Sequence, residues 1–307
     1  MAKIYDSIDE MVGATPLLHL KRIESKLKVK AHLFGKCECF NPAFSVKDRI
    51  AKRMLEKVGF TKITKDTVFV EATSGNTGIG LAALCASKGY KLVIVMPENM
   101  TRERILLIRH YGAEVILTPK EEGMQGAVKK AQLLAQKNKN VILLNQFENP
   151  ANLEAHTLTT AMELMEDLQG EIDVLVAGIG TAGTLMGTAE ALKTCNPDLK
   201  VVAVEPQSSP MLSQGISGPH KIPGIGANFV PPFYRKTLVD EIITVSNEAA
   251  FEFAQKCAAL QGLAIGISAG AALKAAVEIG RRDDMKGKNI VVIFPDSIER
   301  YLSMSYF

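Results

Sequence analysis

The chain lacks the features that mark membrane, secreted and nucleic-acid-binding proteins. No segment approaches the roughly 18 uninterrupted apolar residues of a membrane-spanning helix, and residues 1–10 contain no apolar run of a secretory signal. No basic block is interleaved with aromatic residues, and 36 basic against 33 acidic residues leave a formal net charge of only +3. We therefore expect a cytoplasmic protein that binds neither membrane nor nucleic acid.

Closely paired cysteines are also missing. The five cysteines form no C-x-x-C motif and are odd in number, so we expect free structural thiols. Cys37 and Cys39 alternate along a predicted strand, but no further ligands accompany them at the spacing of a zinc site. The sequence therefore predicts no metal site.

What the sequence does have is a globular composition, with 47% hydrophobic and 22% charged residues over 307 positions. Short β-branched runs alternate with stretches of helical periodicity, which predicts an α/β fold with parallel sheet covered by helices on both faces. The predicted strands are 68–71, 91–96, 114–117, 141–144, 173–177, 200–205 and 289–294. The predicted helices are 77–88, 101–111, 125–138, 152–168, 184–194, 247–261 and 269–279, with Asn247 as a helix cap.

The weakest joint in this pattern lies near Glu148-Asn-Pro150. We predict an N-terminal α/β domain of residues 1–148 and a C-terminal one of 149–307, with about the first 40 residues free to cross to the other domain. Residues 206–232 form the longest irregular stretch, which is typical of a functional or mobile segment. A site in the cleft between the two halves would draw on both of them.

Lys47, in the run Asn41-Pro-Ala-Phe-Ser-Val-Lys-Asp-Arg49, is the first candidate functional residue. A lysine whose pKa is lowered by burial or by neighbouring cations can bond to a carbonyl cofactor and later accept a proton. The alternative is a solvated lysine that merely opens a helix.

Thr73-Ser-Gly-Asn-Thr-Gly78 follows one predicted strand and opens the next predicted helix. Backbone N–H groups and hydroxyls at a helix N-terminus favour an anion such as an amino-acid carboxylate. The alternative is a turn of small residues needed only for tight packing, but glycines alone would satisfy that need.

A second glycine cluster, Gly178-Ile-Gly-Thr-Ala-Gly-Thr184, also lies between a strand and a helix. Its glycines spell G-x-G-x-x-G, and Glu205 ends the next strand, as in dinucleotide-binding enzymes. The hydroxyls of Thr181 and Thr184 suit a phosphate monoester instead. A third cluster, Gly266-Ile-Ser-Ala-Gly-Ala271, opens another helix, where Ser268 suits a plain N-cap.

Together these segments resemble the fold-type II enzymes that use pyridoxal phosphate, and within them the cysteine synthase (O-acetylserine sulfhydrylase) family. The resemblance runs over nearly the whole chain, from Val12-Gly-Ala-Thr-Pro-Leu17 through residues 220–227 to Glu299-Arg-Tyr-Leu-Ser303. Pro295-Asp-Ser-Ile-Glu299 departs from the P-S-S-G-E of sulfhydrylases and is similar to cystathionine β-synthases. Ala182 also replaces a glycine, which would strain a backbone of positive φ.

The resemblance implies two domains, each with a mostly parallel twisted sheet, and pyridoxal 5′-phosphate held as a Schiff base on Lys47. The implied cofactor contacts besides Lys47 are Asn76 at the phenolic oxygen, Gly180, Thr181, Ala182, Gly183 and Thr184 at the phosphate, and Ser268 at the pyridine nitrogen. The implied contacts of the substrate carboxylate are Thr73, Ser74, Gly75, Thr77 and Gln146.

The implied reaction converts O-acetyl-L-serine and sulfide into L-cysteine and acetate through an α-aminoacrylate intermediate, catalysed by a homodimer. Members of the resembled family also bind the C-terminal tail of serine acetyltransferase, so a catalytically idle regulatory protein is one alternative. Others are a β-lyase that releases hydrogen sulfide from cysteine, β-replacement by a thiol to give cystathionine or lanthionine, and an NAD-dependent oxidoreductase.

Several polar residues receive no specific role from the pattern. His156, Tyr234 and Asp240 are interpreted as structural, and the role of Asp296 stays open. Arg102, Arg104 and Arg109 are interpreted as one solvated face of a helix.

Overall fold

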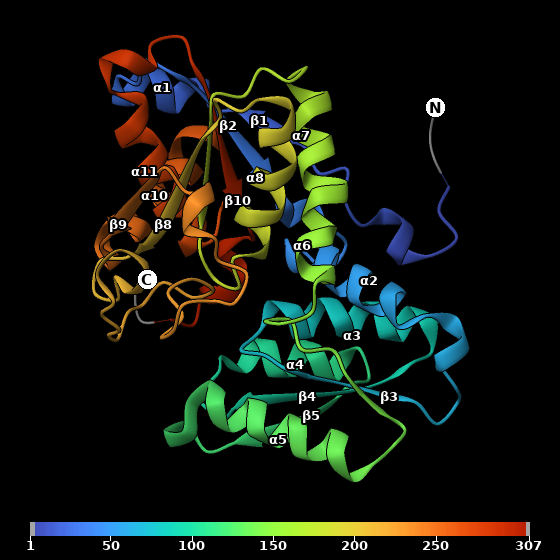
Figure 1. The fold of residues 1–307 in the computed structure, drawn as a ribbon. Coiled ribbons are helices and arrows are strands. Elements are labelled where there is room, and N and C mark those ends of the chain that lie inside the picture. Colours follow the sequence, from blue (N-terminus) through green and yellow to red (C-terminus); the bar gives the residue numbers. More distant parts are fainter. Residues whose placement is uncertain (1–3, 305–307) are drawn as a thin grey trace.

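The structure, a computed structural model, describes residues 4–304, apart from the side chain of Phe60. The prediction that residues 1–10 contain no secretory signal falls partly on residues 1–3, which lie outside the described range. Figure 1 shows two sheets in separate halves of the molecule, with α2 (Lys47–Val58) and α6 (Ala151–Ala155) near their junction. No helix in the described part of the chain is both long and apolar enough to cross a membrane.

The larger sheet has six strands in the order β1-β2-β10-β7-β8-β9. Their bounds are Leu17–His19, His32–Cys37, Asn289–Phe294, Val174–Gly178, Lys200–Pro206 and Glu241–Val245. All neighbours run parallel except β1 and β2, which pair antiparallel. Strands from both ends of the sequence therefore meet in one sheet, although the division at residue 148 itself stays a prediction.

The smaller sheet is fully parallel and has the order β5-β4-β3-β6. Its bounds are Glu114–Thr118, Lys91–Pro97, Val68–Ala72 and Val141–Leu143. The remaining helices are α1 (Lys21–Leu27), α3 (Asn76–Lys88), α4 (Arg102–His110), α5 (Gly123–Lys137), α7 (Ala161–Asp167), α8 (Gly183–Cys195), α9 (Met211–Gln214), α10 (Asn247–Gln261) and α11 (Ile267–Gly280).

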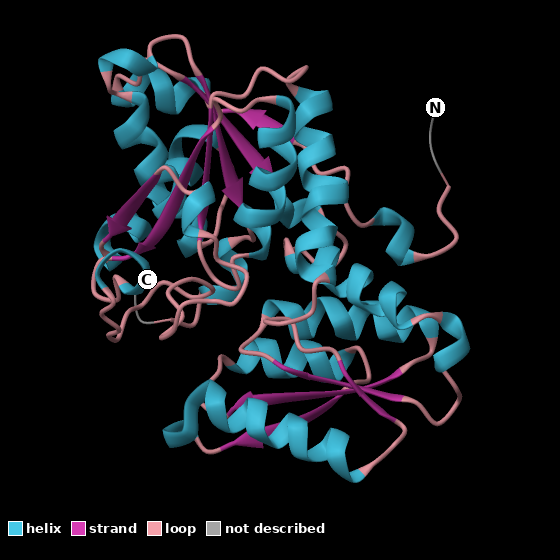
Figure 2. Ribbon diagram, in the orientation of Figure 1, coloured by secondary structure: helices cyan, strands magenta, loops and turns pink. Residues whose placement is uncertain are grey.

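Helices cover both faces of each sheet, as Figure 2 shows. Val174 and Val176 of β7 join the core under α10 and α11, whereas Leu175 and Ala177 join the core under α7 and α8. Successive side chains of a strand point to opposite faces, so burial of both faces explains the uninterrupted apolar runs. The predicted α/β class and all seven predicted strands are confirmed.

Strands β1 and β9 and several local details were not predicted, and of β2 only a strand through Cys37 was expected. Strands β1, β2 and β9 are short or contain polar residues, so their pattern is weak. The interpretation of Cys39 as a strand residue is wrong, because β2 ends at Cys37 and Cys39 lies in a short 3₁₀ helix, Glu38–Phe40. Ser246, rather than Asn247, caps α10 by accepting the Ala249 N–H at 3.2 Å.

Candidate functional site

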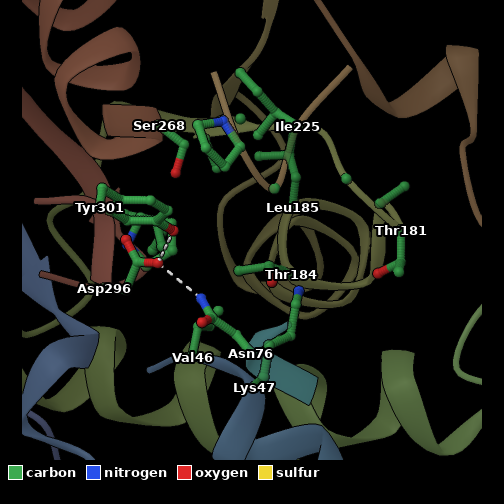
Figure 3. A pocket seen from close by; sticks show the side chains of 18 residues that line it. Val46, Lys47, Asn76, Thr181, Thr184, Leu185, Ile225, Ser268, Asp296 and Tyr301 are labelled. Atoms are coloured by element: carbon green, nitrogen blue, oxygen red, sulfur yellow. Dashed lines mark hydrogen bonds between the residues drawn. The ribbon is translucent and has the colours of Figure 1, made fainter. Parts of the chain in front are cut away.

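A pocket opens where strands of both sheets end, and it gathers most of the predicted cofactor contacts (Figure 3). Carboxyl ends of parallel strands leave helix N-termini and loops at one edge, which is where such folds bind ligands. The predicted residues that line the pocket are Lys47, Asn76, Gly180, Thr181, Ala182, Thr184 and Ser268. The predicted carboxylate contacts Thr73, Ser74, Gly75, Thr77 and Gln146 are not among the lining residues, and neither is Gly183.

Lys47 is the first residue of α2, and its amine points into the pocket toward Thr184. Burial lowers the pKa of Lys47 to about 8, although the negative charge of Asp296 acts in the opposite direction. A larger fraction of this amine is therefore uncharged near neutral pH than of an exposed lysine. The interpretation of Lys47 as merely a solvated helix residue is wrong.

Buried charges hold the segment that carries Lys47. The Asp48 carboxylate accepts the Ala43 N–H at 2.6 Å and folds the preceding loop back onto the helix. Arg49 pairs with Glu38 across 2.7 Å and with Glu163 across 2.6 Å, and the Arg49 side chain is 1% exposed. These pairs explain why charged residues follow Lys47 directly although the helix is buried there.

Asn76 begins α3 and is held at both ends of its amide. Its Nδ2 donates to Asp296 Oδ2 at 2.7 Å, and its Oδ1 accepts from Arg300 Nη1 at 2.5 Å. The C-terminal segment thus reaches the loop that the sequence assigned to substrate binding. Sequence reasoning assigned no role to Arg300 or Asp296, because no local pattern links residues more than 200 positions apart.

In the glycine-rich loop before α8, the backbone at Gly183 lies very close to the side chain of Asn152. A Cβ on Gly183 would lie 1.9 Å from Asn152 Oδ1, so no other residue fits without displacing Asn152. Asn152 in turn donates to Thr181 Oγ1 at 3.0 Å. Ala182 has a φ of +68°, which confirms that the position requires a left-handed backbone and that alanine is strained there.

His156 supports this loop from behind. It lies in a π-helical turn, His156–Thr160, between α6 and α7, and its Nε2 is 3.2 Å from Thr184 Oγ1. Burial and the charges of Arg49 and Lys47 hold the pKa of His156 well below its ordinary value. A neutral, fully buried imidazole that hydrogen-bonds Thr184 fits the predicted structural role.

Ser268 is the second residue of α11, and its hydroxyl points into the pocket. Gly266 occupies the cap position of that helix, so the alternative of Ser268 as a simple N-cap is wrong. The side chain is 5% exposed and lines the pocket opposite Lys47.

The loop of residues 73–78 lies behind Asn76. Thr77 Oγ1 donates to Gln146 Oε1 at 2.6 Å, so two of the predicted carboxylate contacts do come together. Arg104 Nη1 donates to the Ser74 carbonyl at 3.1 Å, and its guanidinium stacks 5.2 Å from the Tyr301 ring centroid. The interpretation of Arg104 as solvated is therefore wrong, whereas Arg102 and Arg109 are exposed.

Glu205 is already fully engaged within the protein. Its carboxylate accepts the N–H groups of Leu212 and Ser213 at 2.7 and 3.1 Å, and the Ser213 hydroxyl at 2.5 Å. It caps the short helix α9 and is 1% exposed, so the carboxylate is not presented to a ribose. This geometry removes the main support for the dinucleotide alternative.

Three other polar features lie outside the pocket. Asp240 accepts the Val201 N–H at 2.7 Å, and the Tyr234 hydroxyl is buried without a hydrogen-bond partner in the described part of the chain. His19, Glu24 and His32 place their ligating atoms within 4.8 Å of one another, but His19 and Glu24 already hydrogen-bond at 2.9 Å. That geometry needs no ion, and the absence of a metal site stays a prediction.

Comparison with known proteins agrees with this geometry. Residues 8–296 match the family described as pyridoxal-phosphate dependent enzyme. The chain is 45% identical to cysteine synthase B of Campylobacter jejuni, over 99% of each protein. A hydrogen sulfide-producing enzyme from Fusobacterium nucleatum has a similar solved structure, with 44% identity, a TM-score of 0.93 and coverage of 97% of this chain and 100% of that one.

A third relative extends the range of activities among similar proteins. The solved structure of an O-acetylserine dependent cystathionine β-synthase from Helicobacter pylori is 37% identical, with a TM-score of 0.93 and 100% coverage of both chains. The family match spans nearly the whole chain, and the relatives align over their full length. The chain therefore belongs to the pyridoxal-phosphate dependent enzyme family.

Proposed function

We propose that this protein makes L-cysteine and acetate from O-acetyl-L-serine and sulfide, using pyridoxal 5′-phosphate attached to Lys47. The observation that carries the proposal is the Lys47 amine, whose pKa is lowered to about 8, in one pocket with Asn76, residues 180–184 and Ser268. Full-length similarity to a cysteine synthase supports the choice of reaction.

The residues of the pocket fit this cofactor. The N-terminus of α8 lies at the pocket, where the helix dipole and backbone N–H groups favour an anion such as a phosphate. The hydroxyls of Thr181 and Thr184 add donors in the same place. When bound, the cofactor supplies an electron-withdrawing ring that stabilises negative charge at the substrate's α-carbon.

Ser268 would face the pyridine nitrogen and limit how strongly the ring withdraws electrons. A hydroxyl, unlike a carboxylate, does not hold that nitrogen protonated. The expected consequence is loss of a leaving group from the β-carbon with little transamination.

Proton transfer would be the task of Lys47, and substrate binding that of the loop of residues 73–77. An amine with a pKa near 8 can take a proton from the α-carbon and return it, because it is uncharged for part of the time at neutral pH. The loop would orient the substrate through its carboxylate, and the hydrogen bond between Thr77 and Gln146, two of the proposed carboxylate contacts, supports this assignment.

Reductive trapping tests this proposal. The purified protein, loaded with pyridoxal phosphate, is treated with borohydride, digested and analysed by mass spectrometry, and cysteine formation is assayed with the untreated protein. We expect the reduced adduct on Lys47 and cysteine from O-acetylserine and sulfide. An adduct on another lysine, or none, would contradict the assignment of Lys47.

A second candidate reaction is release of hydrogen sulfide from cysteine, or β-replacement by a thiol. Asp296, which departs from the sulfhydrylase pattern, lines the pocket, and two similar structures are of a sulfide-producing enzyme and a cystathionine β-synthase. Measuring kcat/KM for all three reactions side by side decides between them. The ranking of the three values, rather than the presence of any one activity, identifies the reaction that the site catalyses best.

A homodimer, binding of a serine acetyltransferase tail and a cytoplasmic location belong to the proposal as well. Leu158 and Met162, one helical turn apart, are 55% and 46% exposed, which is unusual for large apolar side chains on one face. Light scattering after gel filtration gives the oligomeric state.

Binding of the acetyltransferase tail is tested separately. An added tail peptide should compete with O-acetylserine. A catalytically idle protein would instead bind the peptide without turning over any β-substituted alanine.

A further inference from the structure

Asp296 stands at the junction of the two walls of the pocket. It follows β10, is 1% exposed, and its carbonyl accepts the Gly266 N–H at 2.9 Å, two residues before Ser268. The preceding Pro295 carbonyl accepts the Val46 N–H at 2.8 Å, one residue before Lys47. The backbone of Pro295 and Asp296 therefore fixes Asp296 relative to the segments that carry Lys47 and Ser268.

The Asp296 carboxylate is only partly satisfied. Its Oδ2 accepts hydrogen bonds from Asn76 Nδ2, at 2.7 Å, and from the Tyr301 hydroxyl (Figure 3). Its Oδ1 is buried and has no hydrogen-bond partner among the described residues. Burying a carboxylate oxygen in this way is unfavourable, so stability alone does not account for an aspartate here.

The contacts of Asn76 reveal what the carboxylate does. An amide side chain can usually be flipped so that its oxygen and nitrogen exchange places, because the two atoms are similar in size. Here one end faces Asp296, which only accepts, and the other faces Arg300, which only donates. The amide is therefore held in one orientation, and its second N–H has no partner among the described residues.

We propose that Asp296 is a positioning residue that, together with Arg300, fixes the Asn76 amide so that an N–H donor faces the phenolic oxygen of the bound cofactor. A fixed donor favours the deprotonated, negatively charged form of that oxygen. The serine of the sulfhydrylase pattern would not replace this contact, since its side chain is one bond shorter and its hydroxyl both donates and accepts. This inference rests on the proposed function, because it requires the cofactor in the pocket.

A direct effect of Asp296 on Lys47 is the main competing explanation. The charge of Asp296 raises the pKa of Lys47 against the effect of burial, and this influence does not pass through Asn76. A double-mutant cycle separates the two routes, because residues that act through one another give non-additive effects.

The experiment compares the wild type, Asp296→Ser, Asn76→Ala and the double variant, each loaded with pyridoxal phosphate and free of substrate. The absorption spectrum, the dissociation constant of the cofactor and the thermal unfolding midpoint are measured for each. We expect Asp296→Ser to move absorbance from the visible band toward the near-ultraviolet and to weaken cofactor binding about tenfold, the loss of one charge-assisted hydrogen bond. In the Asn76→Ala background the same substitution should change neither quantity further.

Asp296→Asn is the matched control, because it removes the charge but keeps the length of the side chain and an oxygen that can accept the Asn76 N–H, an orientation that Arg300 favours by donating to Asn76 Oδ1. It should retain a wild-type spectrum. Additive effects in the cycle, a spectrum unchanged in Asp296→Ser despite a lower unfolding midpoint, or an Asp296→Asn spectrum equal to that of Asp296→Ser would each overturn the inference. A wild type that carries no cofactor on Lys47 would instead refute the proposed function.

Discussion

The two walls of the pocket are held in place by different means. The wall with Lys47 depends on buried charges, since Arg49 bridges Glu38 and Glu163 beside the helix start. The opposite wall depends on close backbone approach, with Gly183 against Asn152 and a left-handed residue at position 182. The first wall should therefore fail when a charge is removed, and the second when a single methyl group is added.

The largest effect is expected at the charged wall from Lys47→Ala. Under the proposed function, the cofactor would lose its covalent attachment and the substrate proton its acceptor, so kcat/KM for cysteine formation should fall by about 10³-fold or more. Lys57→Ala is the matched control, because Lys57 lies near the other end of α2 and pairs with Glu154 near the surface. Equal losses in both variants would mean that Lys47 has no special role.

Arg49→Met tests the charges that hold this wall. Removing one member of a buried ion pair leaves Glu38 uncompensated, and we expect the free energy of unfolding to fall by about 3–5 kcal/mol in urea denaturation. Arg53→Met on the same helix removes a more exposed pair with Glu154 and should cost about 0.5 kcal/mol. Similar costs for both would show that the buried network does not stabilise the Lys47 segment.

Gly183→Ala tests the opposite wall. The added Cβ would collide with Asn152 Oδ1, so either Asn152 or the loop must move, at a cost of about 1–3 kcal/mol in stability. Because Asn152 also holds Thr181, we expect the dissociation constant of pyridoxal phosphate to rise as well. Fluorescence titration of the cofactor measures this, and unchanged affinity would argue against a phosphate site in this loop.

The attachment of pyridoxal phosphate to cofactor-free protein should depend on pH through Lys47. Only the uncharged amine attacks the aldehyde, and burial lowers the pKa of Lys47 to about 8. The rate should therefore rise about tenfold per pH unit below pH 8 and level off above it. Stopped-flow absorbance follows the reaction, and a rate still climbing steeply above pH 9.5 would indicate an ordinary exposed amine.

Ala182→Gly should have the smallest effect. Glycine relieves the strain of a positive φ but gains flexibility in the unfolded chain, and these effects nearly cancel. We expect the free energy of unfolding to change by less than about 1 kcal/mol, as measured by thermal denaturation. A large loss of stability would show that the alanine methyl makes packing contacts that outweigh its backbone strain.

The sequence predicted the elements whose pattern is local and strong. All seven strands with continuous apolar runs were found, because a strand buried on both faces must be apolar throughout. Strand β1 has only three residues, all half-buried, and β2 begins with an exposed histidine. The sequence therefore missed β1 and predicted only the Cys37 end of β2, because β1 pairs with β2 and β2 pairs with β10 from the far end of the chain.

The candidate site likewise contains residues that local patterns predict and residues that they do not. Three of the predicted residues line the pocket, namely Lys47, Asn76 and Ser268. Each lies at the start of a helix in a short motif, and such motifs can be recognised in the sequence. Arg104 and Arg300 carry no such signal. Their burial against Ser74 and Asn76 follows from how distant helices pack, and residue type alone suggested solvent exposure for Arg104.

Local sequence patterns were enough to predict the layered α/β fold, the glycine-rich turns and the chemical groups near the pocket, because these depend on backbone preferences and on the order of apolar residues over a few positions. The orientation of the Asn76 amide, the hydrogen bonds of Glu205 and the lowered pKa of Lys47 became visible only in the folded protein. Each of those depends on desolvation and on hydrogen bonds between atoms that the folded chain brings together.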